Sequence, residues 1–169
     1  MTITNELIRP FHDVVGQFIG TWTGCGEVLP NPWGYSGATN GQWRFSLALG
    51  DKHVLADYRE ERHDGSAFEG HGLMMQDQES PDVLWFWFDS YGYPPIPEAR
   101  GRHGGTALIF EKVTPRGRGR TTLSIAGEHL HHEAAFQPHD ASSFVIVARG
   151  SYERNTASPI GRGYASVCA

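Results

Sequence analysis

The sequence has little that would indicate a covalent scaffold or a membrane anchor. It contains only two cysteines, Cys25 and Cys168. These are too few for a disulfide framework, and two reduced thiols are expected. No stretch reaches the roughly 18 consecutive apolar residues of a membrane span, and no basic segment followed by an apolar one opens the chain. We therefore expect a cytoplasmic protein with no membrane partner.

Motifs of catalysis are also missing. The chain has no Gly-x-Ser-x-Gly elbow, no phosphate-binding loop, no Cys-x-x-Cys pair and no His-Glu-x-x-His sequence. Basic residues are outnumbered, and the formal net charge is −5, which argues against a nucleic-acid partner. An enzyme is not excluded, because a barrel can assemble a site from scattered residues, but a binding role is favoured.

Turns and rings are abundant. The 169 residues include 21 glycines and 10 prolines, and 12% are aromatic, which is typical of all-β proteins with many short strands. Residues 4–19 place Leu7, Phe11 and Val14 at helical spacing, which predicts one short helix or a broken pair. After Gly20 the apolar period changes to two, which is the period of strands.

This alternation predicts nine strands. In 41–49, for example, Trp43 and Phe45 share one face and Arg44 lies on the other. The predicted strands are 22–29, 41–49, 53–62, 68–77, 83–88, 106–113, 120–126, 128–136 and 143–154. Segment 91–98 contains three prolines and cannot extend a ladder, so it is predicted to be a loop.

No long helix is available to cross between parallel strands, so the sheet is expected to be an antiparallel meander. Closing the sheet removes its edges, and eight or more strands leave room for a ligand. The predicted fold is an all-β, closed antiparallel meander barrel of about 9–10 strands, with a short N-terminal helix capping one end. One domain is expected over residues 1–154, with a loosely ordered tail over 155–169.

Stretch 50–72 carries charges where a barrel would be expected to have an apolar core. It is predicted to form two strands joined by an Asp-Gly turn. Alternation places Asp57 on the wet face of the first strand and Tyr58 on the inner face. In the alternative, charged faces line the lumen, and arginines such as Arg44 and Arg149 clamp an anionic ligand.

On the second of these strands, His71 lies between Gly70 and Gly72 and shares a face with Met75. We expect this face to point inward. His71 would then be a polar group in an apolar pocket, suited to ligand hydrogen bonding or to general-base catalysis. The alternative is a buried structural histidine that is satisfied by a carboxylate such as Asp57.

Large rings are concentrated in 83–88, a strand that is apolar on both faces. Such rings suit a packed core or the wall of an aromatic cavity, and both roles are compatible. The residues predicted to line a ligand cavity are Trp43, Phe45, Tyr58, His71, Met75, Trp85, Trp87 and Arg149. Segment 91–97 would form a semi-rigid lid over it.

Histidines cluster late in the chain. His129, His131 and Glu133 share one face of their predicted strand, and two imidazoles with a carboxylate suit a divalent transition metal. The competing interpretation is a polar stripe that faces solvent, the default in antiparallel sheets. No metal site is predicted, and His129 and His131 are the candidates if one exists.

Several motifs resemble one family. They are Gly20-Thr-Trp-Thr-Gly-Cys-Gly26, the block 50–77, Trp87-Phe-Asp89-Ser-x-Gly92 and Gly150-Ser-Tyr152-Glu-Arg154. Together they resemble the DUF1579 family of unknown function, a lipocalin-like (calycin) barrel distantly similar to nitrobindins and fatty-acid-binding proteins. The resemblance implies an antiparallel barrel and no established activity.

Nitrobindins, which resemble this chain in the opening motif, bind haem through a histidine on a late strand. The predicted late strand 143–154 contains no histidine, so no axial ligand is carried over and no cofactor is predicted. The histidines one strand earlier, His129, His131 and His132, are the alternative ligands.

The function expected from the sequence is that of a small-molecule-binding protein that holds an apolar or amphipathic ligand in the barrel. Three alternatives stay open: a haem- or metal-binding barrel, a hydrolase or isomerase with His71 as general base, and a filled barrel with a structural role. A homodimer is compatible with the sequence. An interior without a void of roughly a few hundred Å³ would exclude the carrier.

Overall fold

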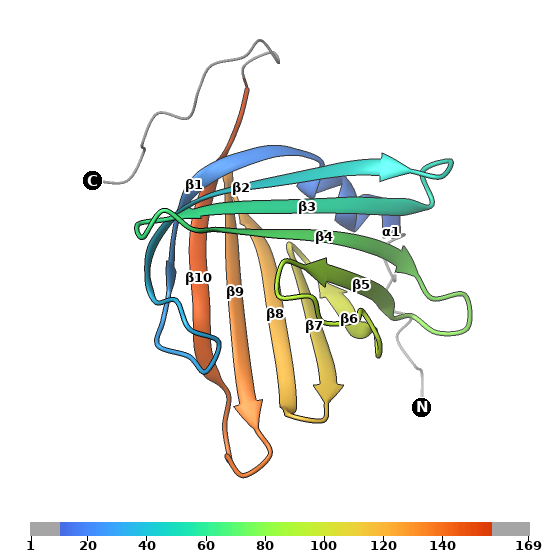
Figure 1. The fold of residues 1–169 in the computed structure, drawn as a ribbon. Helices are drawn as coiled ribbons and strands as arrows, with labels where there is room; N and C mark the ends of the chain where they lie inside the picture. Colours follow the sequence, from blue (N-terminus) through green and yellow to red (C-terminus); the bar gives the residue numbers. More distant parts are fainter. Residues whose placement is uncertain (1–10, 157–169) are drawn as a thin grey trace.

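The computed structural model describes residues 11–156. The elements in this part of the chain are α1 (Phe11–Val15), the 3-10 helix η1 (Gly16–Phe18), β1 (Gly20–Val28), β2 (Gly37–Ala48), β3 (His53–Arg62), β4 (Ala67–Gln76), β5 (Val83–Asp89), β6 (Ala99–Gly104), β7 (Ala107–Thr114), β8 (Gly117–Ala126), β9 (His129–Pro138) and β10 (Val145–Arg154). Each strand pairs antiparallel with the next, and β1 pairs with β10 to close the barrel (Figure 1). The predicted closed meander barrel with a short N-terminal helix is confirmed.

The sequence pattern does not predict β6. Its sequence, Ala-Arg-Gly-Arg-His-Gly, has no apolar alternation, and it pairs with β5 at only three positions. The strand forms because the backbone groups between β5 and β7 need partners for the ring to close. Similarly, β2 begins at Gly37, before the start of the predicted strand 41–49, because Gly37 pairs with Val28 of β1.

One end of the barrel is closed by the helical segment. Its buried side chains are Phe11, Val14, Val15 and Phe18. The indole Nε1 of Trp22 donates a 2.8 Å hydrogen bond to the carbonyl of Phe18. The Arg154 guanidinium lies 4.0 Å from the centre of the Trp22 ring. It also donates to the carbonyls of Ile19 at 2.6 Å and Gln17 at 2.7 Å, so the last strand fastens this cap.

Some expectations lie outside the described residues, namely the first helical positions, 4–10, and the tail from 157 onward. The single domain over 1–154 stays a prediction. Within residues 11–156, no helix has the length and apolar character needed to cross a membrane. Cys25 is disulfide-bonded, so the expectation of a reduced thiol at this position is wrong.

Alternation along β3 decides which side chains enter the barrel. The inner face carries Val54, Ala56 and Tyr58, all buried. The same face continues with Glu60 and Arg62, whose side chains are also almost fully buried. The interior therefore combines packed apolar groups near the cap with a charged pair farther along the strand.

Candidate functional site

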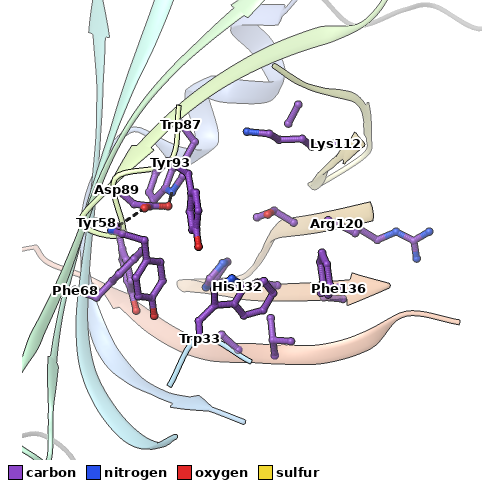
Figure 2. Close-up of a pocket in the computed structure, with 18 of the residues that line it drawn as sticks. Trp33, Tyr58, Phe68, Trp87, Asp89, Tyr93, Lys112, Arg120, His132 and Phe136 are labelled. Carbon is purple, nitrogen blue, oxygen red and sulfur yellow. Dashed lines mark hydrogen bonds between the residues drawn. The ribbon is translucent and has the colours of Figure 1, made fainter. Parts of the chain in front are cut away.

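A cavity of about 570 Å³ lies inside the barrel (Figure 2). Its wall is mainly aromatic. The rings that line it belong to Trp33, Trp43, Tyr58, Phe68, Trp85, Trp87, Phe110, Phe136 and Tyr152. The interior is therefore not filled, and the void has the size of pockets that hold small molecules, roughly 300–1,000 Å³.

Five of the residues predicted to line a cavity border it: Trp43, Tyr58, Trp85, Trp87 and Arg149. Phe45 instead lies in the packed end, where its ring stacks on Trp43 with centroids 5.4 Å apart and contacts Phe18. Arg149 borders the cavity, but its guanidinium is on the outer face and donates to Glu27 Oε2 at 3.0 Å. Phe45 thus supports the cap, and Arg149 is already neutralised.

His71 points away from the cavity, and the expectation that it faces the interior is wrong. Its side chain is 55% exposed, and its Nδ1 lies 2.5 Å from Asp57 Oδ1 on the outer face. Met75 lies on the same outer face, four residues along, next to the buried Met74. His71 cannot reach a molecule in the cavity, so it cannot act there as the general base of a hydrolase or isomerase.

The glycines beside His71 have a different role from the one expected. Gly70 and Gly72 face inward, and the indoles of the neighbouring strand lie over them. A Cβ on Gly70 would come within 1.9 Å of Trp87, and one on Gly72 within 2.2 Å of Trp85. These positions make room for the rings of the cavity wall and bring no ligand to His71.

The late histidines divide between the two faces of β9. His129 and His131 are exposed on the outer face, so neither lines the cavity. Within the described part of the chain, no three His, Cys, Asp or Glu side chains are grouped closely enough to hold a metal ion. His132, one residue along, faces inward and lines the cavity.

The sequence names His132 only as an alternative haem ligand and does not predict that it lines the cavity. Its ring centroid lies 5.3 Å from that of Trp43, edge to face, and 6.0 Å from that of Tyr58. Burial lowers the pKa of His132 to about 4, so the imidazole is neutral near pH 7. The available signal was the alternation of Leu130, His132 and Ala134, an apolar face that carries one histidine.

A buried polar network forms one side of the cavity. Glu60 accepts hydrogen bonds from the Tyr58 hydroxyl at 2.9 Å and from Arg62 Nε at 2.8 Å. The Tyr58 hydroxyl also lies 3.2 Å from the Tyr152 hydroxyl. Burial raises the pKa of both phenols, that of Tyr152 to about 12, so both stay protonated near neutral pH. Glu60 and Arg62 neutralise each other within this network.

The loop between β5 and β6 lines the mouth of the cavity with Tyr91, Tyr93 and Ile96. Arg62 Nη2 donates to the Tyr91 hydroxyl at 3.1 Å. Arg116 Nη1 donates to the Tyr93 hydroxyl at 2.6 Å, and its guanidinium lies 3.9 Å from the centre of that ring. Arg62 and Arg116 therefore hold segment 91–97, which the sequence analysis predicts to be a lid.

Lys112 and Asp89 add opposite charges to the cavity wall. They lie on the inner faces of β7 and β5 and line the cavity. Burial lowers the pKa of the Lys112 ammonium and raises that of the Asp89 carboxyl. The sequence pattern identifies neither residue as part of a site, because a single charge in a strand becomes informative only when the facing strands are known.

No family model matches the chain, and no curated protein does. Among solved structures, the barrel is similar to Rv2717c from M. tuberculosis, with a TM-score of 0.67, 13% identity and coverage of 86% of this chain and 98% of that one. It is also similar to the S-type phycobiliprotein lyase CPES from Guillardia theta, with a TM-score of 0.64, 9% identity and coverage of 89% and 96%. At such identities the likeness shows the calycin-like fold alone.

Proposed function

We propose that this protein binds one small apolar or amphipathic molecule inside its barrel. The observation that carries the proposal is the void of about 570 Å³ walled by aromatic rings. Protein interiors are packed as densely as organic crystals and hold few voids larger than a water molecule. A space of this size, lined by rings and a few polar groups, is typical of a ligand site.

The polar groups of the wall can orient such a molecule. The neutral imidazole of His132 offers hydrogen bonds amid the rings, and the Tyr58 hydroxyl, whose proton is donated to Glu60, can accept one. The aromatic side chains, Trp85 and Trp87 among them, supply the apolar area that stabilises a bound ring or chain. In this proposal His132 takes the orienting role that the sequence assigned to His71.

We also propose that the chain belongs to the DUF1579 family, on the strength of the motifs quoted above. Close packing between strands explains the glycines of the opening motif. A Cβ on Gly24 would come within 2.1 Å of the Ser151 carbonyl oxygen, and one on Gly26 within 2.9 Å of Thr39 Oγ1. The glycines allow β1 to lie close to its neighbours where the barrel closes.

A titration with N-phenylnaphthylamine, an uncharged aromatic probe whose fluorescence rises in apolar sites, tests the binding proposal. Thr121 lines the cavity, so Thr121→Trp places an indole in part of it and should raise the Kd of the probe about tenfold. The matched control is Thr122→Trp, because Thr122 is the next residue of β8 and lies on the outer face. This variant should bind the probe like the wild type.

Thermal melts of both variants establish that each is folded before titration. Two results would contradict the proposal: wild-type protein that binds no probe, or equal weakening of binding in both variants. Native mass spectrometry of gently purified wild-type protein then reports a carried molecule by its mass.

Haem is a second candidate ligand, and His132 is the observation that favours it. A metal-binding imidazole must be neutral, and His132 is the neutral histidine of the cavity wall. It would hold the iron, while the rings of the wall suit the apolar macrocycle. Iron bound in this way supplies redox and gas-binding chemistry.

Titration with haemin tests this candidate. A Soret band is expected in the wild type and should be lost in His132→Ala. It should persist in His131→Ala, because His131 lies on the outer face. It should also persist at pH 5, since a proton competes for the imidazole only near its pKa of about 4. Wild-type protein that gains no band with haemin excludes haem.

A further inference from the structure

Lysine is rare in this chain, and one of its two lysines lies inside the barrel. The 14 basic residues include only Lys52 and Lys112 as lysines. Lys52 is exposed in the turn between β2 and β3. Lys112 lies on the inner face of β7 and lines the cavity. Figure 2 shows its ammonium directed into the cavity, toward the side that holds Trp87 and Tyr93.

This ammonium has no direct partner within the described residues. Between residues 11 and 156, Lys112 forms no ion pair and no hydrogen bond, and the only charge that acts on it noticeably is that of Asp89. Burial lowers the pKa of Lys112, which means that the charged form is poorly solvated where it lies. A bound anion would supply the missing interaction.

Asp89 does not supply it, because its oxygens are engaged elsewhere. Its Oδ2 accepts a hydrogen bond from Trp87 Nε1 at 3.2 Å, and its Oδ1 accepts one from the backbone N–H of Tyr91 at 3.0 Å. The carboxylate is therefore turned toward the loop and the indole. It interacts with Lys112 through its field and not through contact.

Arg116 adds a second cation at the mouth. It is held by the ring and hydroxyl of Tyr93, and among residues 11–156 it forms no pair with a carboxylate. The other arginines that border the cavity each have a carboxylate: Arg62 with Glu60, Arg120 with Glu111 and Arg149 with Glu27. Lys112 and Arg116 together outnumber the carboxylate of Asp89, so positive charge prevails in this part of the cavity, in a chain whose net charge is −5.

We propose that the cavity selects molecules that combine an apolar body with one anionic group, a carboxylate or a sulfonate, which pairs with Lys112. The inference rests on the proposed function and names the class of its ligand. The apolar body lies against the rings, and the anionic group lies at the mouth, within the field of Arg116. A neutral molecule of the same shape fills the same space but leaves Lys112 without a partner.

Two fluorescent probes with the same ring system test the inference, since anilinonaphthalenesulfonate carries one sulfonate and N-phenylnaphthylamine carries none. The wild type should bind the sulfonate more tightly. Lys112→Met should raise the Kd of the sulfonate about tenfold and leave that of the neutral probe unchanged or lower. Lys52→Met removes the same charge from the exposed turn and should alter neither Kd.

The outcomes separate the two proposals. If neither probe binds the wild type, the proposed function fails. If both bind but Lys112→Met leaves the sulfonate Kd unchanged, or weakens both probes equally, the cavity stands and its selectivity for anions is wrong. Lys112→Gln removes the same charge and replaces Lys112→Met if the latter does not show a wild-type thermal melt.

Discussion

Replacement of Glu60 by alanine is expected to lower the free energy of unfolding by about 3–5 kcal/mol. The change removes the carboxylate that accepts hydrogen bonds from Arg62 and Tyr58. The Arg62 side chain is only 9% exposed, so its charge would be stranded in the wall of the barrel. A stranded charge costs more than the intact pair contributes. Urea unfolding measures the difference.

Glu61 provides the control. It is the next residue of β3, its side chain is 49% exposed, and its ion pair with Arg59 is long, at 3.7 Å. Glu61→Ala should change the stability by no more than about 0.5 kcal/mol. The double replacement of Glu60 by leucine and Arg62 by methionine should recover most of the lost stability, because no charge is left unpaired. Equal effects of the two alanine variants would refute the assigned role of the buried pair.

Gly72→Val is expected to destabilise the protein by about 3 kcal/mol and to abolish binding of N-phenylnaphthylamine. A Cβ at this position would lie 2.2 Å from Trp85 Nε1 and 2.9 Å from a ring carbon of Trp87. Trp85 is only 4% exposed and cannot swing into solvent, so both rings must move toward the cavity. Fluorescence titration and urea unfolding report the two effects separately.

Gly104→Val is the matched control, because Gly104 also lies in a strand, at the end of β6, and a Cβ there would meet nothing within 4 Å. Its stability should stay within about 0.5 kcal/mol of the wild type, with unchanged probe binding. If Gly72→Val binds the probe normally, the space over Gly72 does not determine where the indoles of the cavity wall lie.

Period-two alternation was sufficient to predict the barrel and the inner face of β3. Val54, Ala56 and Tyr58 form an apolar set opposite charged residues, so only one orientation buries ring and aliphatic surface. The same reasoning extends to Trp43 on β2, which pairs directly with Tyr58. Where one face is clearly more apolar, sequence reasoning correctly identifies the side chains that point into the barrel.

The reasoning failed on β4, because the volume on its inner face comes from another strand. Leu73 and Met75 made the His71 face look like the buried one. In the folded chain the opposite face, with Gly70 and Gly72, is covered by indoles from β5. Glycines contribute no side chain to a face, so the sequence of β4 alone does not show that this face is buried. The side chains that bury it belong to β5.

The inward positions of His132 and Lys112 were not predicted, for a related reason. On β9 the polar residues on both faces drew attention to His129 and His131, although the face of His132 is the more apolar one. On β7, Lys112 follows Phe110 on a single inner face, but nothing local distinguishes an interior lysine from an exposed one. The side chains that bury Lys112 and lower its pKa come from strands distant in the sequence.

The pairing of β1 with β10 has a consequence for how the chain is made. Trp22 pairs with Arg154, and Arg154 also bonds the carbonyls of the cap at Ile19 and Gln17. Contacts this far apart in sequence have a high loop-closure entropy and form slowly. During synthesis, one edge of β1 therefore stays unpaired until β10 has emerged. The barrel, and with it the wall of the cavity, is therefore closed only after the last strand has paired with the first.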